Sequence, residues 1–307
     1  MEFWLPYGKT EVPVAVPDEN LLGLLVPDED FPSQNIGDAI TAALQCRVGD
    51  KALAEAARQA NRTAIALNGD SPASVSFSRL LANELSTAGA HGVFLLESAS
   101  DPTQPPSSRV LPEKVLDQTS ELLRHDRRTS PVVKVGELDG GGEVLVNERF
   151  ATADIRCIVT NVGVNPFWGY AGGPSFVLVG LASESTIRAC LSPTLRSAGL
   201  PAVLAGNPAY EALLRGSQTM RVDFAVHIVE AADGKIAGVF AGDFLETFQN
   251  ACALAERIFR PRLERKADIV ISSAGGVPWD RTLSDVCACG IIATTACKDH
   301  GILVLVA

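Results

Sequence analysis

The chain has 307 residues, about twice the ~150 residues of a typical domain, so one large domain and two linked domains are both compatible with its length. Its composition is 47% hydrophobic and 20% charged, which excludes a largely disordered chain. The formal net charge of -10, from 36 acidic and 26 basic side chains, argues against nucleic acid as a partner.

No apolar stretch reaches the roughly 18 to 20 residues that a bilayer requires, and the first residues lack the pattern of a secretory signal. We therefore expect a soluble, cytoplasmic protein with no membrane partner. The seven cysteines are odd in number and lie mostly in apolar segments, which indicates reduced thiols rather than disulfides.

The first half of the chain predicts an opening β-hairpin, then alternating helices and strands. The hairpin covers 3–16 and a Pro- and Asp-rich loop follows it. Asp50 is the expected N-cap of the second helix. The expected elements after the loop are helices at 36–45 and 50–60, a strand at 63–69, a helix at 74–89, a strand at 92–98 and a helix at 112–125. This βαβα order predicts a parallel sheet with ligands bound at the carboxyl ends of its strands.

The second half adds hairpins and a short closing unit, in which Asp280 is expected to cap the helix. Its expected elements are a hairpin over 131–150, a strand at 155–164, a hairpin over 221–242, a helix at 244–259, a strand at 267–273, a helix at 281–297 and a strand at 301–307. The predicted fold is α/β, with a mostly parallel sheet, flanking helices, inserted hairpins and a small C-terminal βαβ unit. We expect one domain over 1–265 and a second over 266–307.

Three loops that follow buried strands are candidate binding loops: 68–72, 165–175 and 272–280. Their glycines let backbone N–H groups converge on an anion, and nearby aromatic side chains could wall a pocket. The alternative is that the glycines only supply positive φ in tight turns. No histidine pair has the spacing of metal ligands, and Cys287 and Cys289 are too close for a zinc knuckle. We therefore expect no metal site.

Motifs at these loops resemble the nickel-dependent lactate racemase family (LarA-like proteins), and the resemblance covers nearly the whole chain. It includes the opening Tyr7-Gly-Lys9 hairpin, the GEVLVNERFATADI stretch, the loop 169–173, the Phe240-Ala-Gly-Asp243 turn and the IVISSAGGVPWD run that ends at 280. The resemblance implies a two-domain α/β fold, of which this chain holds the first domain and a remnant of the second.

The resemblance also implies catalytic residues that this chain lacks. A family lysine that carries a nickel-pincer cofactor aligns with Ser175, one base histidine with Asn165, and a nickel-ligating histidine with Leu191. The arginine of the family's carboxylate-binding motif aligns with Ser71. The second base histidine falls near 98–100, where no histidine occurs, and a later Gln and Lys become Asp285 and Ala288. We therefore expect no nickel-pincer cofactor.

The leading hypothesis is a diverged isomerase or lyase for a small hydroxy-acid-like ligand, working without the nickel pincer. The alternatives are a catalytically inactive homologue with a structural or regulatory role, and a racemase completed by a partner chain. We also expect a homo-oligomer, because an open cluster of aromatic side chains often marks an interface. The aromatic residues expected to form such a cluster are Phe167, Trp168, Tyr170 and Trp279. The expected catalytic residues are Asp70, Asn165, Tyr170 and Ser175, and the expected substrate-binding residues are Asn68, Ser71, Trp168, Gly172, Gly173 and Asp280.

Overall fold

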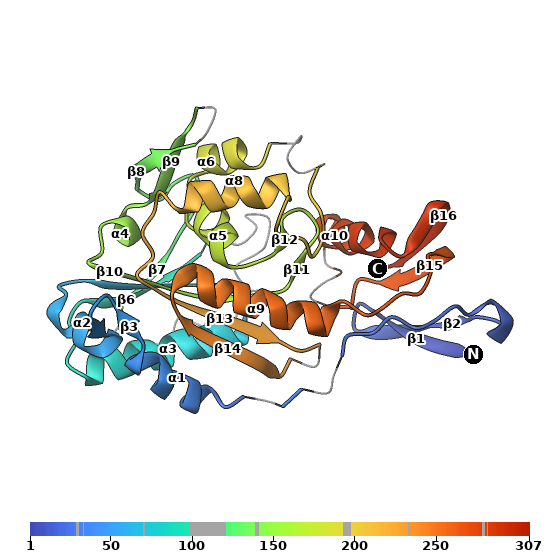
Figure 1. Cartoon of the computed structure of the whole chain (residues 1–307), viewed down its shortest axis with the longest axis horizontal. Helices are drawn as coiled ribbons and strands as arrows, with labels where there is room; N and C mark the ends of the chain where they lie inside the picture. Colours follow the sequence, from blue (N-terminus) through green and yellow to red (C-terminus); the bar gives the residue numbers. More distant parts are fainter. Residues whose placement is uncertain are drawn as a thin grey trace. The chain divides into compact units, whose positions relative to one another are not determined.

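The computed structural model describes residues 1–28, 31–32, 34–69, 71–98, 121–138, 141–192, 198–232, 234–277, 280 and 282–307 (Figure 1). These residues form two compact units. The smaller unit comprises Met1–Pro27 and Arg260–Ala307, and the larger unit comprises Asp28–Phe259. The structure thus groups the first residues of the chain with the last ones, which the sequence did not indicate. The division at residue 265 stays a prediction.

A six-stranded sheet forms the centre of the larger unit, in the order β14-β13-β10-β5-β6-β7. The strands from β13 to β7 pair in parallel, and β14 pairs antiparallel to β13. The strands are β5 (Thr63–Leu67), β6 (Val93–Glu97), β7 (Glu121–Arg124), β10 (Ile155–Asn161), β13 (Phe224–Glu230) and β14 (Ile236–Gly242). The predicted mostly parallel α/β fold is confirmed. The carboxyl ends of β5, β10 and β13 consequently lie side by side.

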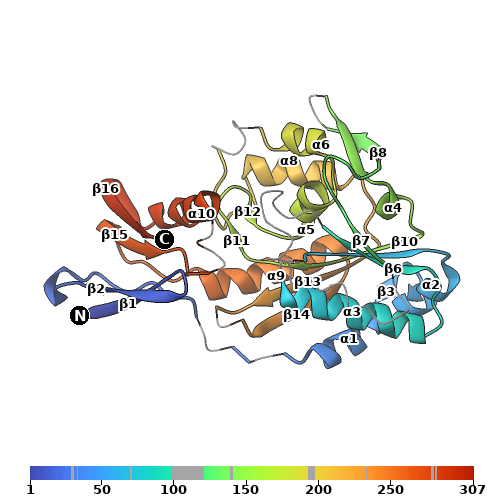
Figure 2. The ribbon, with the colours of Figure 1, turned by 180° about the vertical axis from the view of Figure 1, so that it is seen from behind.

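Helices cover one face of this sheet (Figure 2). A continuous apolar core lies between these helices and the strands. Phe77 and Leu81 of α3 pack there with Ile65 of β5 and Val226 of β13. Every residue of β5 and β6 is buried, as expected for parallel strands covered on both faces. The helices on this face are α1 (Ile36–Gln45), α2 (Leu53–Gln59) and α3 (Pro72–Thr87).

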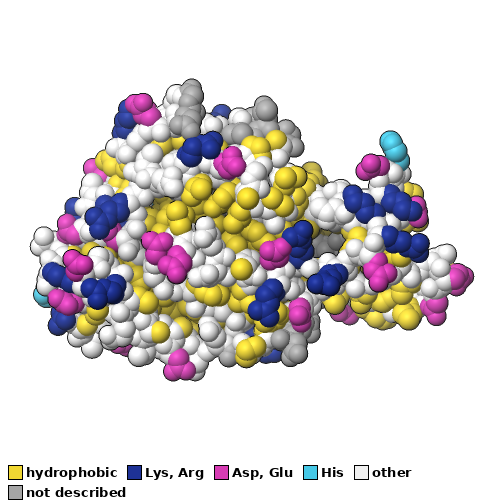
Figure 3. Space-filling model, in the orientation of Figure 1, with side chains coloured by type: hydrophobic (Ala, Val, Ile, Leu, Met, Phe, Trp, Pro, Cys, Tyr) yellow, Lys and Arg dark blue, Asp and Glu magenta, His cyan; other side chains and the backbone are white. Residues whose placement is uncertain are grey.

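The opposite face carries a second set of helices. The predicted helix over 244–259 is confirmed as α9, and its buried residues include Phe248, Ala251 and Ala255. A π-helical turn, Phe176–Gly180, continues the short helix α5. The helices on this side are α4 (Glu148–Ala151), α5 (Gly173–Ser175), α6 (Glu184–Cys190), α8 (Pro208–Ser217) and α9 (Phe244–Phe259). On the face drawn in Figure 3, Lys and Arg side chains lie interspersed with Asp and Glu.

Short antiparallel ladders complete the larger unit. The predicted hairpin over 131–150 is confirmed by the pairing of β8 with β9, and the hairpin over 221–242 by the pairing of β13 with β14. The remaining strands are β3 (Arg47–Val48), β4 (Lys51–Ala52), β8 (Val132–Glu137), β9 (Glu143–Asn147), β11 (Val164–Asn165) and β12 (Gly169–Tyr170).

One predicted helix and one predicted cap in this unit are wrong. Residues 121–124 of the expected helix 112–125 form strand β7 instead, and 112–120 lie outside the described residues. Pairing with β6 overrides the helical periodicity, because Leu122 and Leu123 each lie opposite a buried leucine of β6. Asp50 does not cap α2; the N-cap is Ala52, which provides no side-chain acceptor.

The outer edge of β14 is partly covered by the segment that leads into α1. The backbone N–H of Gln34 donates to the carbonyl of Ile236 at 2.9 Å. The Gln34 side-chain oxygen accepts from the N–H of Val239 at 2.7 Å. One residue thus satisfies both a carbonyl and an N–H group on the free edge of the sheet.

The described residues of the smaller unit form two strand pairs, a 3-10 turn and an α-helix. The opening hairpin is confirmed, and β15 and β16 pair in parallel around α10, as the predicted βαβ unit requires. Asp280 does not cap the helix: the N-cap is Thr282, and Asp280 accepts from the N–H of Gly8 at 2.5 Å. The elements are β1 (Glu2–Tyr7), β2 (Thr10–Ala15), a 3-10 turn (Asp18–Asn20), β15 (Ala267–Ser273), α10 (Leu283–Thr294) and β16 (Cys297–Val306).

The cysteines and histidines form no metal cluster in the part of the chain that the structure describes. All seven cysteines are free thiols, as expected. Within the same described ranges, no helix is both long and apolar enough to cross a bilayer.

Candidate functional site

Polar side chains from three neighbouring strands meet at the carboxyl edge of the sheet. Asn161 is the last residue of β10 and Glu230 the last residue of β13. Ser71 follows β5 and is the N-cap of α3, where its hydroxyl accepts from the N–H of Ser74 at 3.1 Å. Parallel sheets bind ligands at this edge, because the strand-end loops gather there.

The side-chain amide of Asn161 forms hydrogen bonds through both its oxygen and its nitrogen. Its oxygen accepts from the hydroxyls of Ser71 at 2.8 Å and Ser74 at 2.6 Å. Its amide nitrogen donates to the Glu230 carboxyl. An ionised carboxylate only accepts hydrogen bonds, so the amide nitrogen must face Glu230, and this leaves the amide oxygen for the two hydroxyls. Asn161 therefore links the start of α3 to the end of β13.

Glu230 is a half-buried carboxyl group with a perturbed acidity. Burial raises the pKa of Glu230 above its usual range, because a desolvated carboxylate loses the stabilisation that water provides. Hydrogen bonds from the side chain of Asn161 and the backbone of Ala73 lower the pKa and partly offset this effect, and the Ser71 hydroxyl, whose one proton can go either to Asn161 or to Glu230, contributes in the same direction. Sequence reasoning missed Asn161, Ser74 and Glu230, because neither spacing nor composition marks them.

The loop around Gly172 and Gly173 lies directly against the end of β10. Both glycines have positive φ, +87° and +49°. A Cβ at Gly172 would lie 2.8 Å from the carbonyl oxygen of Asn161 and 3.0 Å from Oγ1 of Thr160, and a Cβ at Gly173 would lie 2.5 Å from the Phe248 ring. Only glycine fits such close approaches. The two glycines therefore supply the positive φ that a tight turn needs. They also place the loop backbone against the edge of the sheet.

Three buried polar groups near this contact lack partners among the described residues. The N–H groups of Gly172 and Gly173 donate to no described acceptor. The Oγ1 of Thr160, a residue that is 1% exposed, is likewise unpaired within the described chain. Unpaired buried N–H groups are rare in proteins, so this cluster can bind a ligand or an ordered water.

Asn165, Trp168, Tyr170 and Ser175 lie in the same loop, but their contacts are mainly local. The Asn165 side-chain oxygen accepts from the N–H groups of Phe167 at 2.9 Å and Trp168 at 3.2 Å. The Ser175 hydroxyl donates to the carbonyl of Gly172 at 2.9 Å. Tyr170 is 3% exposed, and Trp168 is half-buried between two core clusters. These contacts hold the loop in shape.

The 68–72 loop joins the same edge through Asn68 and Ser71. The N–H of Asn68 donates to the carbonyl of Val159 on β10 at 3.3 Å. A Cβ at Gly69 would lie 2.3 Å from Oε1 of Glu97 at the end of β6, and Glu97 is paired with Arg124 at 2.8 Å. Asp70 lies outside the described residues, and Asp280 belongs to the smaller unit. The structure thus places the other predicted site residues in the larger unit, in the segments 68–71 and 165–175.

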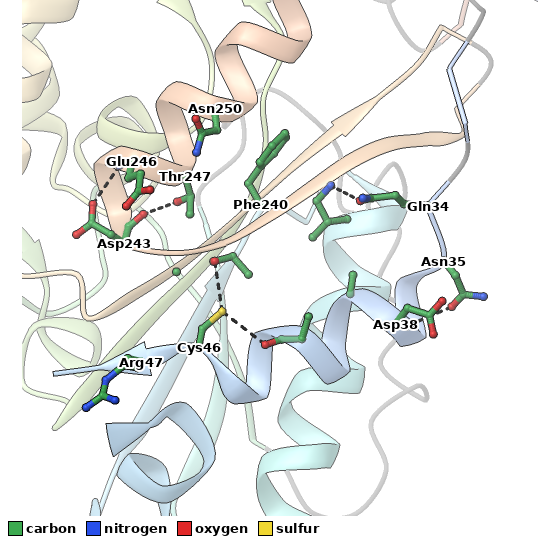
Figure 4. A pocket seen from close by; sticks show the side chains of 15 residues that line it. Gln34, Asn35, Asp38, Cys46, Arg47, Phe240, Asp243, Glu246, Thr247 and Asn250 are labelled. Atoms are coloured by element: carbon green, nitrogen blue, oxygen red, sulfur yellow. Dashed lines mark hydrogen bonds between the residues drawn. The ribbon is translucent and has the colours of Figure 1, made fainter. Parts of the chain in front are cut away.

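A pocket of about 820 Å³ lies elsewhere in the larger unit, between α1, the end of β14 and the start of α9 (Figure 4). Asp38, Cys46, Arg47, Asp243 and Glu246 are among its lining residues. Because β14 is antiparallel, its last residues lie opposite the amino end of β13, away from the end where Glu230 lies. No described member of the predicted site set lines this pocket.

Comparison with known proteins connects this chain to lactate racemases. A family model described as the lactate racemase N-terminal domain matches residues 7–197. The lactate racemase of Thermoanaerobacterium thermosaccharolyticum is 24% identical over 99% of this chain and 73% of its own length. That of Lactiplantibacillus plantarum is 26% identical over 99% of this chain and 74% of its own length.

Solved structures resemble this one in fold. The lactate racemase apoprotein from Thermoanaerobacterium thermosaccharolyticum has a TM-score of 0.83 at 23% identity, covering 99% of this chain and 74% of that chain. A protein from Thermotoga maritima has a TM-score of 0.58 at 16% identity, covering 78% of this chain and 63% of that chain.

The prediction that the protein carries no cofactor is wrong. The two curated relatives are lactate racemases, and their family is nickel-dependent. The replacements at individual positions do not show that this member lacks the cofactor. Ser175 and Asn165, which the resemblance aligned with the family's lysine and base histidine, form local hydrogen bonds: Ser175 donates to the carbonyl of Gly172, and Asn165 accepts from the N–H groups of Phe167 and Trp168.

Proposed function

Since the chain belongs to the lactate racemase family, we propose that it interconverts the enantiomers of a small 2-hydroxy acid. Relatives that match 99% of the chain are lactate racemases, which supports a racemase-like function. The proposed site is the carboxyl edge of β5, β10 and β13, together with the Gly172–Gly173 loop.

The observation that carries the proposal is the cluster of unpaired buried polar groups at the end of β10. The N–H groups of Gly172 and Gly173 have no described acceptor, and the hydroxyl of Thr160 has no described partner. Each buried polar group without a partner costs about 1 to 3 kcal/mol. A bound carboxylate would accept from the two N–H groups and from the hydroxyl, and would remove this cost.

Other residues of the loop would keep the cluster in place. The Ser175 hydroxyl holds the carbonyl of Gly172, and the Asn165 side chain holds the turn at 167–168. In the proposal, both residues position the loop backbone, while Trp168 and Tyr170 limit the access of water to it. Asn68, Asp70, Ser71 and Asp280 stay predicted site residues.

Racemisation can be tested directly. The purified full chain, with its nickel content measured, is incubated separately with D-lactate and L-lactate, and the products are separated by chiral chromatography. We expect each enantiomer to convert into an equal mixture of both. If neither enantiomer changes in the nickel-containing protein, the proposal fails and a homologue with a structural or regulatory role becomes the better interpretation.

Two matched threonines test whether the site lies at the carboxyl edge. Thr160 and Thr63 are both buried strand residues whose hydroxyls have no described partner, but Thr160 is near the carboxyl end of β10 and Thr63 begins β5. Thr160→Val should raise the KM for a 2-hydroxy acid about tenfold, the effect of one lost hydrogen bond of about 1.4 kcal/mol. Thr63→Val should leave the KM unchanged. Equal KM values for the two variants would place the site elsewhere.

A further inference from the structure

His227 is a buried histidine whose ring has one nitrogen without a partner. It lies on β13, none of its surface is exposed, and its Nε2 atom has no hydrogen-bond partner among the described residues. Thr160 of β10 is 1% exposed, and its Oγ1 atom is also without a described partner. Buried polar groups without a partner are rare in proteins, so two such groups on neighbouring strands indicate a shared partner.

The two side chains lie next to each other on one face of the sheet. β10 and β13 are parallel, and Thr160 and His227 are directly paired positions of the two strands. Side chains two residues apart in a strand share a face. Ile158 and Ala225, two residues before each of them, both belong to the apolar cluster that contains Leu213 of α8. Neighbouring strands are about 4.8 Å apart, so one small molecule can reach both side chains.

The hydrogen bonds of Thr247 determine which ring nitrogen of His227 carries the proton. The Thr247 hydroxyl donates to the carbonyl of Asp243 at 2.5 Å. A hydroxyl group has a single proton, so Oγ1 of Thr247 can only accept from Nδ1 of His227, which is 3.0 Å away. Burial lowers the pKa of His227 to about 3, and the ring is therefore neutral at neutral pH. Nδ1 thus holds the only N–H of the ring, and Nε2 is an acceptor.

The surroundings of the two atoms limit the size of the shared partner. A Cβ at Gly172 would lie 3.0 Å from Oγ1 of Thr160, so the glycine keeps that side of the hydroxyl clear of a side chain. The Phe248 ring contacts His227, with the ring centroids 5.5 Å apart. Because Thr160 and His227 are almost fully enclosed, the partner must be about as small as a water molecule.

We propose that one ordered water molecule binds between Thr160 and His227, donating one O–H to Nε2 of His227 and the other to Oγ1 of Thr160. A hydroxyl oxygen that accepts from the water can still donate its own proton. The consequence of the water rests on the proposed function: the Thr160 proton is then directed to the carboxylate bound at the Gly172–Gly173 loop. His227 is therefore a positioning residue, which acts on Thr160 through the water.

Nitrogen NMR of the full chain with isotope-labelled histidine tests the proposal without any added ligand. His227→Gln identifies the His227 signals by their loss. We expect the proton on Nδ1, and the Nε2 resonance at the lower chemical shift of a nitrogen that accepts a hydrogen bond. Thr160→Val should move this resonance to the higher shift of an unbonded nitrogen, because the water loses one of its two partners. Thr63→Val is the control and should leave the resonance unchanged, because Thr63 begins β5.

Three results would overturn the proposal. They are a proton on Nε2, an unbonded Nε2 in the unchanged protein, and a Thr160→Val spectrum identical to that of the unchanged protein. A crystal structure of the unchanged protein provides a test that needs no variant. An ordered water should lie within hydrogen-bond distance of both atoms, and direct contact between the two side chains would contradict the proposal.

This proposal and the proposed function fail separately, because the water is detected in the absence of lactate. A bonded Nε2 without racemisation contradicts only the proposed function, and racemisation with an unbonded Nε2 contradicts only the water. Adding lactate tests the positioning role. The Nε2 resonance should keep its bonded shift while Thr160 donates to the carboxylate. A move to the unbonded shift would show that lactate displaces the water, and would overturn the positioning role of His227.

Discussion

Asn161 organises the candidate site, and the sequence gives no indication of it. Its partners Ser71 and Glu230 lie 90 and 69 residues away along the chain, so their proximity comes from strand order alone. The glycine loops could be recognised, because positive φ and close backbone approach leave a mark on the sequence. A hydrogen-bond network between three strand ends leaves no such mark on the sequence. The loop at 165–175 was therefore predicted, while the polar network beside it was not.

His227 is the most strongly perturbed histidine of the described chain, and it predicts a pH effect on stability. It is fully buried on β13 between the rings of Phe244 and Phe248, and its Nδ1 lies 3.0 Å from Oγ1 of Thr247. Burial lowers the pKa of His227 to about 3. The folded protein thus keeps His227 neutral while the unfolded chain takes up a proton below about pH 6.5, so stability falls as the pH falls.

Between pH 7.5 and pH 5.5 this difference amounts to about 1.4 kcal/mol of unfolding free energy. Urea unfolding at the two pH values measures how much unfolding free energy each protein loses between them. The unchanged protein should lose about 1.4 kcal/mol more than His227→Gln, because the glutamine side chain cannot titrate. The exposed His91 provides the control, and His91→Gln should behave like the unchanged protein. An equal loss in His227→Gln would mean that His227 is protonated in the folded state.

At the scale of elements, periodicity identified α9 correctly and failed at β7. The apolar residues of α9 recur on one face that the sheet buries, so local pattern and tertiary packing agree. Residues 121–124 have a sequence that also suits a helix, but pairing with β6 decides their conformation. Strand pairing depends on residues far away in sequence, and a local pattern cannot report it.

The start of α9 allows a test of helix capping. The Asp243 side chain accepts from the N–H groups of Leu245 and Glu246, each at 3.0 Å. Asp243→Ala should lower the unfolding free energy by about 1 kcal/mol, the usual effect of removing an N-cap acceptor. Asp243→Asn keeps an acceptor and should lose much less. Chemical denaturation measures both changes, and equal losses would show that the charge, rather than the cap, stabilises the helix.

At the scale of the whole molecule, the α/β class and the parallel sheet could be predicted, but the exposure of the aromatic side chains could not. The sequence suggested an open cluster of aromatic residues around the 165–175 loop as a reason for self-association. The structure instead buries Tyr170 and half-buries Trp168. Burial depends on how the loop packs on α8 and α9, which no motif records. Self-association stays a prediction, but the surface that supports it is not the 165–175 loop.

The smaller unit provides that surface. Ile269 on β15 and Ile302 and Val304 on β16 are 56%, 58% and 42% exposed, and apolar side chains gathered on one strand pair commonly mark an interface. Sedimentation velocity at micromolar concentration should give a species larger than the monomer. Ile302→Lys should shift it toward the monomer, whereas Leu80→Lys, on the exposed side of α3, should not. A clean monomer of the unchanged protein would contradict this prediction.

Gln34 limits how the central sheet can grow. A bare outer strand is a template onto which another molecule can add its own strand, and repeated addition produces fibres. With its N–H on Ile236 and its side-chain oxygen on Val239, Gln34 occupies hydrogen-bonding positions that an incoming strand would need. An incoming strand would have to displace Gln34 before it could pair with this part of β14.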